Sequence, residues 1–123
     1  LDQPQQAQIH LELGLTISQQ IGDRDLQALS HAYLGEAFYQ LNQLESATYH
    51  ACLGMYLLEQ RLSKAWQHSA ALIVVLQGKL SSESFSNILQ QMRSQFIALI
   101  GIDGFDHLPN LIERYRQGDT KTS

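Results

Sequence analysis

Two parts of the chain, 40 residues apart, resemble each other, and this repetition restricts the fold more than any other feature of the sequence. When the sequence is shifted by 40 residues, residues 1–22 lie over residues 41–62 with seven identities in 22 positions. The identical pairs are Leu1/Leu41, Gln3/Gln43, Ala7/Ala47, His10/His50, Leu13/Leu53, Gly14/Gly54 and Gln20/Gln60. Periods of roughly 34 to 47 residues are typical of helical solenoids, in which each helix pair stacks on the next because it cannot bury its apolar face alone.

The amino-acid composition favours helices over strands. Among the 123 residues are 20 Leu, 16 Gln and 10 Ala, which are good helix formers, but only two Val. No stretch alternates apolar and polar residues between turn signals, as a half-buried strand would. The chain is therefore predicted to be all-α, and its length fits a single domain.

Capping residues and glycines divide the chain into six expected helices. Asp and Ser are favoured just before the first turn of a helix, and Gly just after the last turn. The first helix is expected to have its cap at Asp2 and to end before Gly22, and the second to run from Asp23 or Asp25 to Leu41. The other expected helices are 44–60, 64–77 with Ser63 as cap and Gly78 as stop, 82–100 with Ser81 or Ser82 as cap and Gly101 as stop, and 106–117 after a loop at 102–105.

The segment 33–47 resembles a known family. Its residues Tyr33-Leu34-Gly35-Glu36-Ala37-Phe38-Tyr39 and Leu41-Asn42-Gln43-Leu44-Glu45-Ser46-Ala47 are similar to the signature of the tetratricopeptide repeat, and Gly54 stands at the family's second small position. Ile21-Gly22-Asp23-Arg24 is similar to the linker of the longer, roughly 40-residue bacterial variety. The resemblance implies a tetratricopeptide-like α-solenoid of about six helices in stacked antiparallel pairs, with small residues where two helices cross closely.

The resemblance also gives the expected organisation of the chain. One domain, residues 1–117, contains the second helix of a truncated repeat (1–22), the best-matching repeat (23–62), a degenerate repeat (63–101) and a capping helix (105–117), and is followed by a flexible tail (118–123). Val75, Asn87 and Ser94 make the repeat 63–101 degenerate, because they stand where the family has small residues. We expect the chain to be a fragment of a larger protein; the alternative is that an unpaired N-terminal helix serves as a cap.

Charge and apolar patterning argue against two classes of partner. The formal net charge is −4, the pI is about 5.6 and Lys and Arg are not clustered, which disfavours nucleic acid and anionic membrane surfaces. The longest apolar run, Ala70–Leu76, is far shorter than the ~20 residues that span a bilayer. The single cysteine, Cys52, excludes an internal disulfide and fits a reducing compartment, so a cytoplasmic location is expected.

The sequence offers few candidates for catalytic or metal-binding residues. His10 and His50 are repeat copies, expected on successive second helices roughly 15–20 Å apart, which is too far to share a metal ion. The acidic pair Asp103 and Asp106 lies beside His107, but Gly101 and Gly104 favour a turn there rather than a metal loop. Cys52 is expected to be a packed thiol, because no Arg or Lys lies near it in the sequence. We therefore expect no enzyme activity, no metal and no cofactor.

The resemblance implies a binding groove along the first helix of each pair. The groove suits an apolar or amphipathic segment of a protein or peptide, because Ala32, Tyr33 and Glu36 replace the family's clamp for a terminal carboxylate. Alternatively, Tyr33 and Tyr39 on one helix, and Leu72, Ile73 and Leu76 on the other, belong to the core. The groove candidates are Leu29, Ala32, Tyr33, Glu36, Tyr39, Ser69, Leu72, Leu76 and Lys79.

These features predict a non-catalytic scaffold for protein–protein interaction, with a terminal structural cap that mediates self-association as the alternative. The apolar stripe Ala7, Leu11, Gly14, Ile17 and Ile21 of the first helix is expected to face inward. An upstream helix would cover part of this stripe and its flank. In its absence we expect a homodimer contact through the first helix, around Ile9, Leu13 and Leu15.

Overall fold

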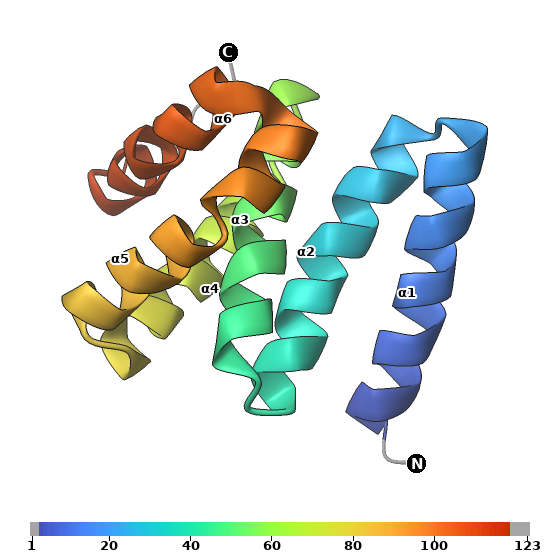
Figure 1. The fold of residues 1–123 in the computed structure, drawn as a ribbon, viewed down its shortest axis with the longest axis horizontal. Helices are drawn as coiled ribbons and strands as arrows, with labels where there is room; N and C mark the ends of the chain where they lie inside the picture. The colour runs from blue at the N-terminus through green and yellow to red at the C-terminus, as the bar shows by residue number, and fades with distance from the viewer. Residues whose placement is uncertain (1–2, 119–123) are drawn as a thin grey trace.

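A computed structural model describes residues 3–118, and these residues form six α-helices with no β-strand among them (Figure 1). This part of the chain is therefore all-α, as the composition predicts. The helices are α1 (Gln3–Ile21), α2 (Arg24–Gln40), α3 (Leu44–Gln60), α4 (Trp66–Lys79), α5 (Ser82–Gln91) and α6 (Arg93–Arg116). The cap expected at Asp2 and, except for Gly118, the tail expected at 118–123 lie outside the described residues.

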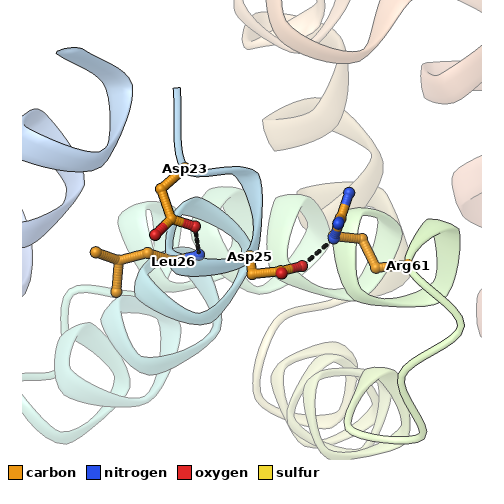
Figure 2. A network of polar contacts seen from close by, with 4 residues as sticks. All are labelled: Asp23, Asp25, Leu26 and Arg61. Carbon is orange, nitrogen blue, oxygen red and sulfur yellow. Dashed lines mark hydrogen bonds and ion pairs between the residues drawn. The ribbon is translucent and has the colours of Figure 1, made fainter. Parts of the chain in front are cut away.

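Local signals explain the first three helices, whose bounds agree with the sequence prediction to within about a residue. Gly22 has a positive φ of 74° and separates α1 from α2, because glycine has no Cβ to oppose that conformation. The carboxylate of Asp23 caps α2 by accepting a hydrogen bond from the backbone N–H of Leu26 at 3.0 Å (Figure 2). Asn42, with a φ of 58°, turns the chain between α2 and α3.

An ion pair joins the beginning of α2 to the residue that follows α3. Figure 2 shows the carboxylate of Asp25, in the first turn of α2, beside the guanidinium of Arg61. Both side chains are largely exposed, so the pair adds little free energy and mainly marks the register of the two helices.

Small residues allow α2 and α3 to approach closely. A Cβ added to Gly35 would lie 3.0 Å from the backbone N of Ala51, and one added to Gly54 would lie 2.7 Å from the Cα of Ala32. Gly14, the sequence copy of Gly54, has no such contact, because its Cβ would first meet the Ser30 hydroxyl at 4.0 Å. The repetition in sequence is thus not matched by equally close packing of α1.

Both ends of α4 differ from the prediction. The helix begins at Trp66 rather than directly after Ser63, whose hydroxyl instead accepts a hydrogen bond from the backbone N–H of Ala65 at 3.2 Å. Gly78 does not end α4, which continues to Lys79. Gly78 has a negative φ and open space around it, so nothing in its backbone breaks the helix.

The predicted helix 82–100 is two helices, because the chain turns at Met92 between α5 and α6. The predicted loop at 102–105 is also wrong: α6 kinks at Gly101, where φ is 76° and ψ is 168°, and is helical again from residue 102. Gly104 is buried within this helix, where an added Cβ would lie 2.9 Å from the Ile100 side chain and 3.0 Å from the ring of Tyr56 in α3. This glycine serves close packing of two helices rather than a turn.

Each helix from α1 to α4 packs against the next one along the chain, and α6 packs on α3 and α4 (Figure 1). The largest fully buried side chains include Trp66 and Phe96, which lie in the same apolar core as Leu34, Leu53 and Leu108. The guanidinium of Arg114 lies 5.2 Å from the centre of the Trp66 ring. Among the described residues, no helix combines the length and the apolar character needed to cross a membrane.

Candidate functional site

A hollow of about 250 Å³ lies between α2 and α4. Residues of α2 at steps of three and four share one face of that helix, and residues of and just before α4 do the same on the opposite side. Leu58 of α3, which is only 4% exposed, forms the inner wall. The hollow is lined by Leu29, Ala32, Tyr33, Glu36, Leu58, Ala65, His68, Ser69 and Leu72.

The structure brings six of the nine predicted groove residues together around this hollow, namely Leu29, Ala32, Tyr33, Glu36, Ser69 and Leu72. Three lie elsewhere. Leu76 is fully buried in the core, so its prediction as a groove residue is wrong, and the alternative that it packs between helices holds. Tyr39 and Lys79 do not line the hollow but meet each other, with the ammonium of Lys79 5.6 Å from the centre of the Tyr39 ring. Sequence reasoning missed His68, Ala65 and Leu58.

Tyr33 and Glu36 also line a second hollow, of about 390 Å³, between α1 and α2. They share its wall with residues of α1, among them Ala7, His10 and Leu11. Tyr33 is 54% exposed and is therefore not a core residue. The side chains of Tyr33 and Glu36 thus stand between two hollows, one on each side of α2.

A pair of histidines, which the sequence analysis missed, joins α2 to α3. The Nδ1 atoms of His31 and His50 lie 2.9 Å apart, so one imidazole donates a hydrogen bond and the other accepts it. The pKa of each imidazole is lowered to about 4, by burial at His50 and by burial together with the neighbouring His50 at His31. The His50 ring also stacks on Phe38, with centroids 5.3 Å apart. This pair belongs to the packing between two helices and lines neither hollow.

The remaining chemical candidates do not form a site. Burial raises the pKa of the Cys52 thiol to about 12, so the thiol stays protonated and is a poor nucleophile. His107 packs edge-on against Tyr56, with ring centroids 6.3 Å apart, while Asp103 and Asp106 are exposed. Among residues 3–118, no group of three or more His, Cys, Asp and Glu side chains could hold a metal ion.

The N-terminal helix presents a different apolar face from the predicted one. Leu15, predicted as a self-association residue, is half-buried and packs against the core. Ile17 and Ile21, predicted to face inward, are exposed, as are Ile9 and Leu13. The inward face of α1 instead includes Ser18, which is fully buried and whose hydroxyl donates a hydrogen bond to the Leu15 carbonyl at 2.8 Å. Because serine is polar, an inward face that is predicted from apolar residues alone does not include it.

Comparison with models of known protein families, with curated proteins and with solved structures gave no match to this chain. What the protein does must therefore be inferred from the two hollows and the surfaces of the helices around them.

Proposed function

We propose that the protein is a non-catalytic module for protein–protein interaction, a tetratricopeptide-like stack in which α2 and its neighbours bind an apolar or amphipathic segment of a partner. The observation that carries this proposal is the pair of hollows on the two sides of Tyr33 and Glu36. Two hollows separated by one helix can receive two side chains of the same bound segment. The exposed ring of Tyr33 then lies against the backbone between them.

The size of the first hollow favours a side chain over a free small molecule. Its volume of about 250 Å³ is below the ~300–1,000 Å³ of most small-molecule sites. The apolar side chains of Leu29, Leu58 and Leu72 line it, which suits an aliphatic or aromatic anchor. With one side chain of the partner in the hollow, the rest of the bound segment can lie along the exposed face of α2.

Glu36 gives the partner a second chemical requirement. Its carboxylate lines both hollows and is exposed, and the chain carries a net charge of −4. A Lys or Arg between two apolar residues of the bound segment would meet this carboxylate. Such an ion pair at the rim favours association and register more than affinity. The proposed partner is therefore a segment with a basic residue flanked by two apolar ones.

A self-filled groove would have favoured the alternative role of a terminal cap. Within the described residues, no side chain of α6 lines either hollow, and α6 packs on α3 and α4 without contacting α2. The hollows on both sides of α2 are therefore open to a partner, which supports binding over capping.

The experiment is a titration of the ¹⁵N-labelled protein, followed by amide chemical shifts, with three 12-residue peptides. The first carries a Lys between two Leu residues, the second replaces that Lys by Glu, and the third replaces both Leu residues by Ser. We expect the first peptide to shift amides of α2 and α4, the second to bind about two- to fivefold more weakly, and the third not to bind.

Matched variants separate the hollow from the rest of the surface. Leu29→Ser with Leu72→Ser should abolish binding of the first peptide, whereas Leu99→Ser, on the exposed surface of α6, should leave it unchanged. Glu36→Gln should remove the preference for Lys, and Glu45→Gln, outside both hollows, should retain it. Shifts confined to helices other than α2 and α4, or no binding of any peptide at millimolar concentration, would contradict the proposal.

A further inference from the structure

The outward face of α1 carries a row of four exposed aliphatic side chains, which we call the α1 ridge. Ile9, Leu13, Ile17 and Ile21 are 51%, 58%, 44% and 68% exposed, respectively. They follow one another at intervals of four residues, so they form a continuous row along the helix, inclined to its axis. A row of this kind is one of the two ridges with which helices pack against each other.

Nothing in the described chain covers this ridge. Within residues 3–118, α1 packs against α2 and against no other helix (Figure 1). Ser18 is the only fully buried residue of α1, and Leu11 and Leu15 complete its contact with the core. The ridge thus lies on the part of α1 that has no neighbour.

We propose that the α1 ridge binds the α1 ridge of a second copy of this chain, which gives a weak dimer with twofold symmetry. The charge distribution favours this occupant. Glu12 is the only Asp, Glu, Lys or Arg in α1, and at 100° per residue it lies about a third of a turn from the middle of the ridge. The whole chain carries a net charge of −4, so two copies meet with little repulsion when they approach through this nearly uncharged helix.

The shape of the ridge points to the same occupant. In a twofold contact the same patch on each copy must fit itself. Two identical rows of residues spaced by four interlock when the helices cross at about 50°, because the ridge of each helix fits the groove beside the ridge of the other. The four side chains of the row are all leucine or isoleucine and are therefore nearly equal in size.

The length of α1 sets the expected strength of the dimer. At about 1.5 Å per residue, 19 residues extend about 28 Å, and two such helices crossing at an angle touch over only part of that length. The contact falls short of the ~800 Å² per partner of a standard stable interface. We therefore expect a dissociation constant between about 10 µM and 1 mM rather than an obligate dimer.

Sedimentation velocity of the intact chain over that concentration range tests the proposal. The parent should pass from monomer to dimer, while Leu13→Glu and Ile17→Glu should each raise the dissociation constant at least tenfold by placing two like charges at the contact. Gln19→Glu is the matched control, since it adds the same charge to an exposed position of α1 outside the ridge, and it should change the constant less than threefold. All three substitutions are at exposed positions, and circular dichroism should show unchanged helix content.

Two results would overturn the inference. One is a parent that remains monomeric throughout the concentration range. The other is a dimer that both ridge variants form as well as the parent, which would place self-association elsewhere on the surface. Neither result bears on the hollows beside α2, so peptide binding measured on the same variants tests the proposed function separately.

Discussion

At the scale of single residues, the close crossing of α2 and α3 depends on two glycines that have different amounts of space. A Cβ on Gly54 would lie 2.7 Å from backbone atoms of Ala32, which cannot move without moving α2. A Cβ on Gly35 would lie 3.0 Å or more from backbone atoms of Ala51, so α3 would have to shift by only a few tenths of an ångström. The repeat signature predicted both as small residues. Their difference depends on how two backbones meet, which one sequence does not reveal.

This difference makes Gly54→Ala a direct test of the crossing. We expect the substitution to lower the free energy of unfolding by about 1–3 kcal/mol, because the overpacked Cβ costs more than the gain in helix propensity. Gly78→Ala is the matched control: Gly78 lies inside α4 with nothing within 4 Å of its Cβ position, and alanine there should add about 0.5–1 kcal/mol. Urea unfolding followed by circular dichroism measures both. Equal effects of the two substitutions would contradict the close approach.

The histidine pair predicts how stability changes with pH. His31 and His50 have a pKa of about 4 in the folded chain against an ordinary value of 6.5, so the unfolded chain binds more protons between these values. Stability is fully present above pH 6.5 and is lost as the pH falls towards 4. Because the two imidazoles interact, this loss belongs to the pair rather than to either residue.

The matched variants for this prediction are His31→Gln with His50→Gln, and His10→Gln as a control on the exposed surface of α1. Urea unfolding at pH 7.0 and pH 4.5 gives the pH dependence for each. The double variant should lose clearly less stability than the parent over this interval, whereas His10→Gln should lose as much as the parent. A double variant with the same pH dependence as the parent would show that burial of these two imidazoles does not govern it.

At the scale of helices, the sequence predicts bounds well where local signals decide them and poorly where packing does. The cap at Asp23 and the turn at Asn42 are local, and the helices beside them lie where predicted. The turn at Met92 has no glycine, proline or polar cap that would have predicted it. Gly101 breaks the helix as predicted, whereas Gly104, predicted to belong to the same turn, packs against Tyr56, a residue distant in sequence.

The same limits apply to the candidate site. The resemblance to the tetratricopeptide repeat placed Leu29 and Tyr33 among the groove residues, and both line the hollow. It did not separate Leu72, which lines the hollow, from Leu76, which is in the core one turn later. That separation depends on how α4 packs against the helices around it, which a pattern within one helix does not give.

The kink of α6 gives a prediction at this scale. Gly101 has a φ of 76° and a ψ of 168°, a backbone conformation that is essentially restricted to glycine. Gly101→Ala should therefore cost about 1–3 kcal/mol although no atom lies within 4 Å of the Cβ position. Ala98→Gly, at an exposed position of the same helix, should cost no more than about 1 kcal/mol and serves as control. Thermal melting measures both, and a Gly101→Ala variant as stable as the parent would contradict the kinked backbone.

At the scale of the whole molecule, the part of α6 after the kink closes the core. Its buried side chains are Phe105, Leu108, Leu111 and Ile112, and it packs on α3 and α4, the helices that contribute Leu58 and Leu72 to the first hollow. The capping helix is therefore more than a polar cover at the end of a stack. It contributes apolar residues to the same core as Trp66.

A chain shortened to end at Gly101 tests this role. Each of the four buried side chains contributes about 1.5–3 kcal/mol by burial, and their sum is comparable to the ~5–15 kcal/mol of a whole domain. We expect the shortened chain to lose its cooperative thermal transition and to bind a dye for exposed apolar surface, while the N-terminal helices keep part of their helical signal. A chain ending at Gly118 is the control, because residues 119–123 contain no aliphatic or aromatic side chain, and its melting temperature should be unchanged. If the chain ending at Gly101 melted as cooperatively as the parent, α1 to α5 with the first part of α6 would be stable without the rest of the chain. The second part of α6 would then be dispensable for the shape of the hollows.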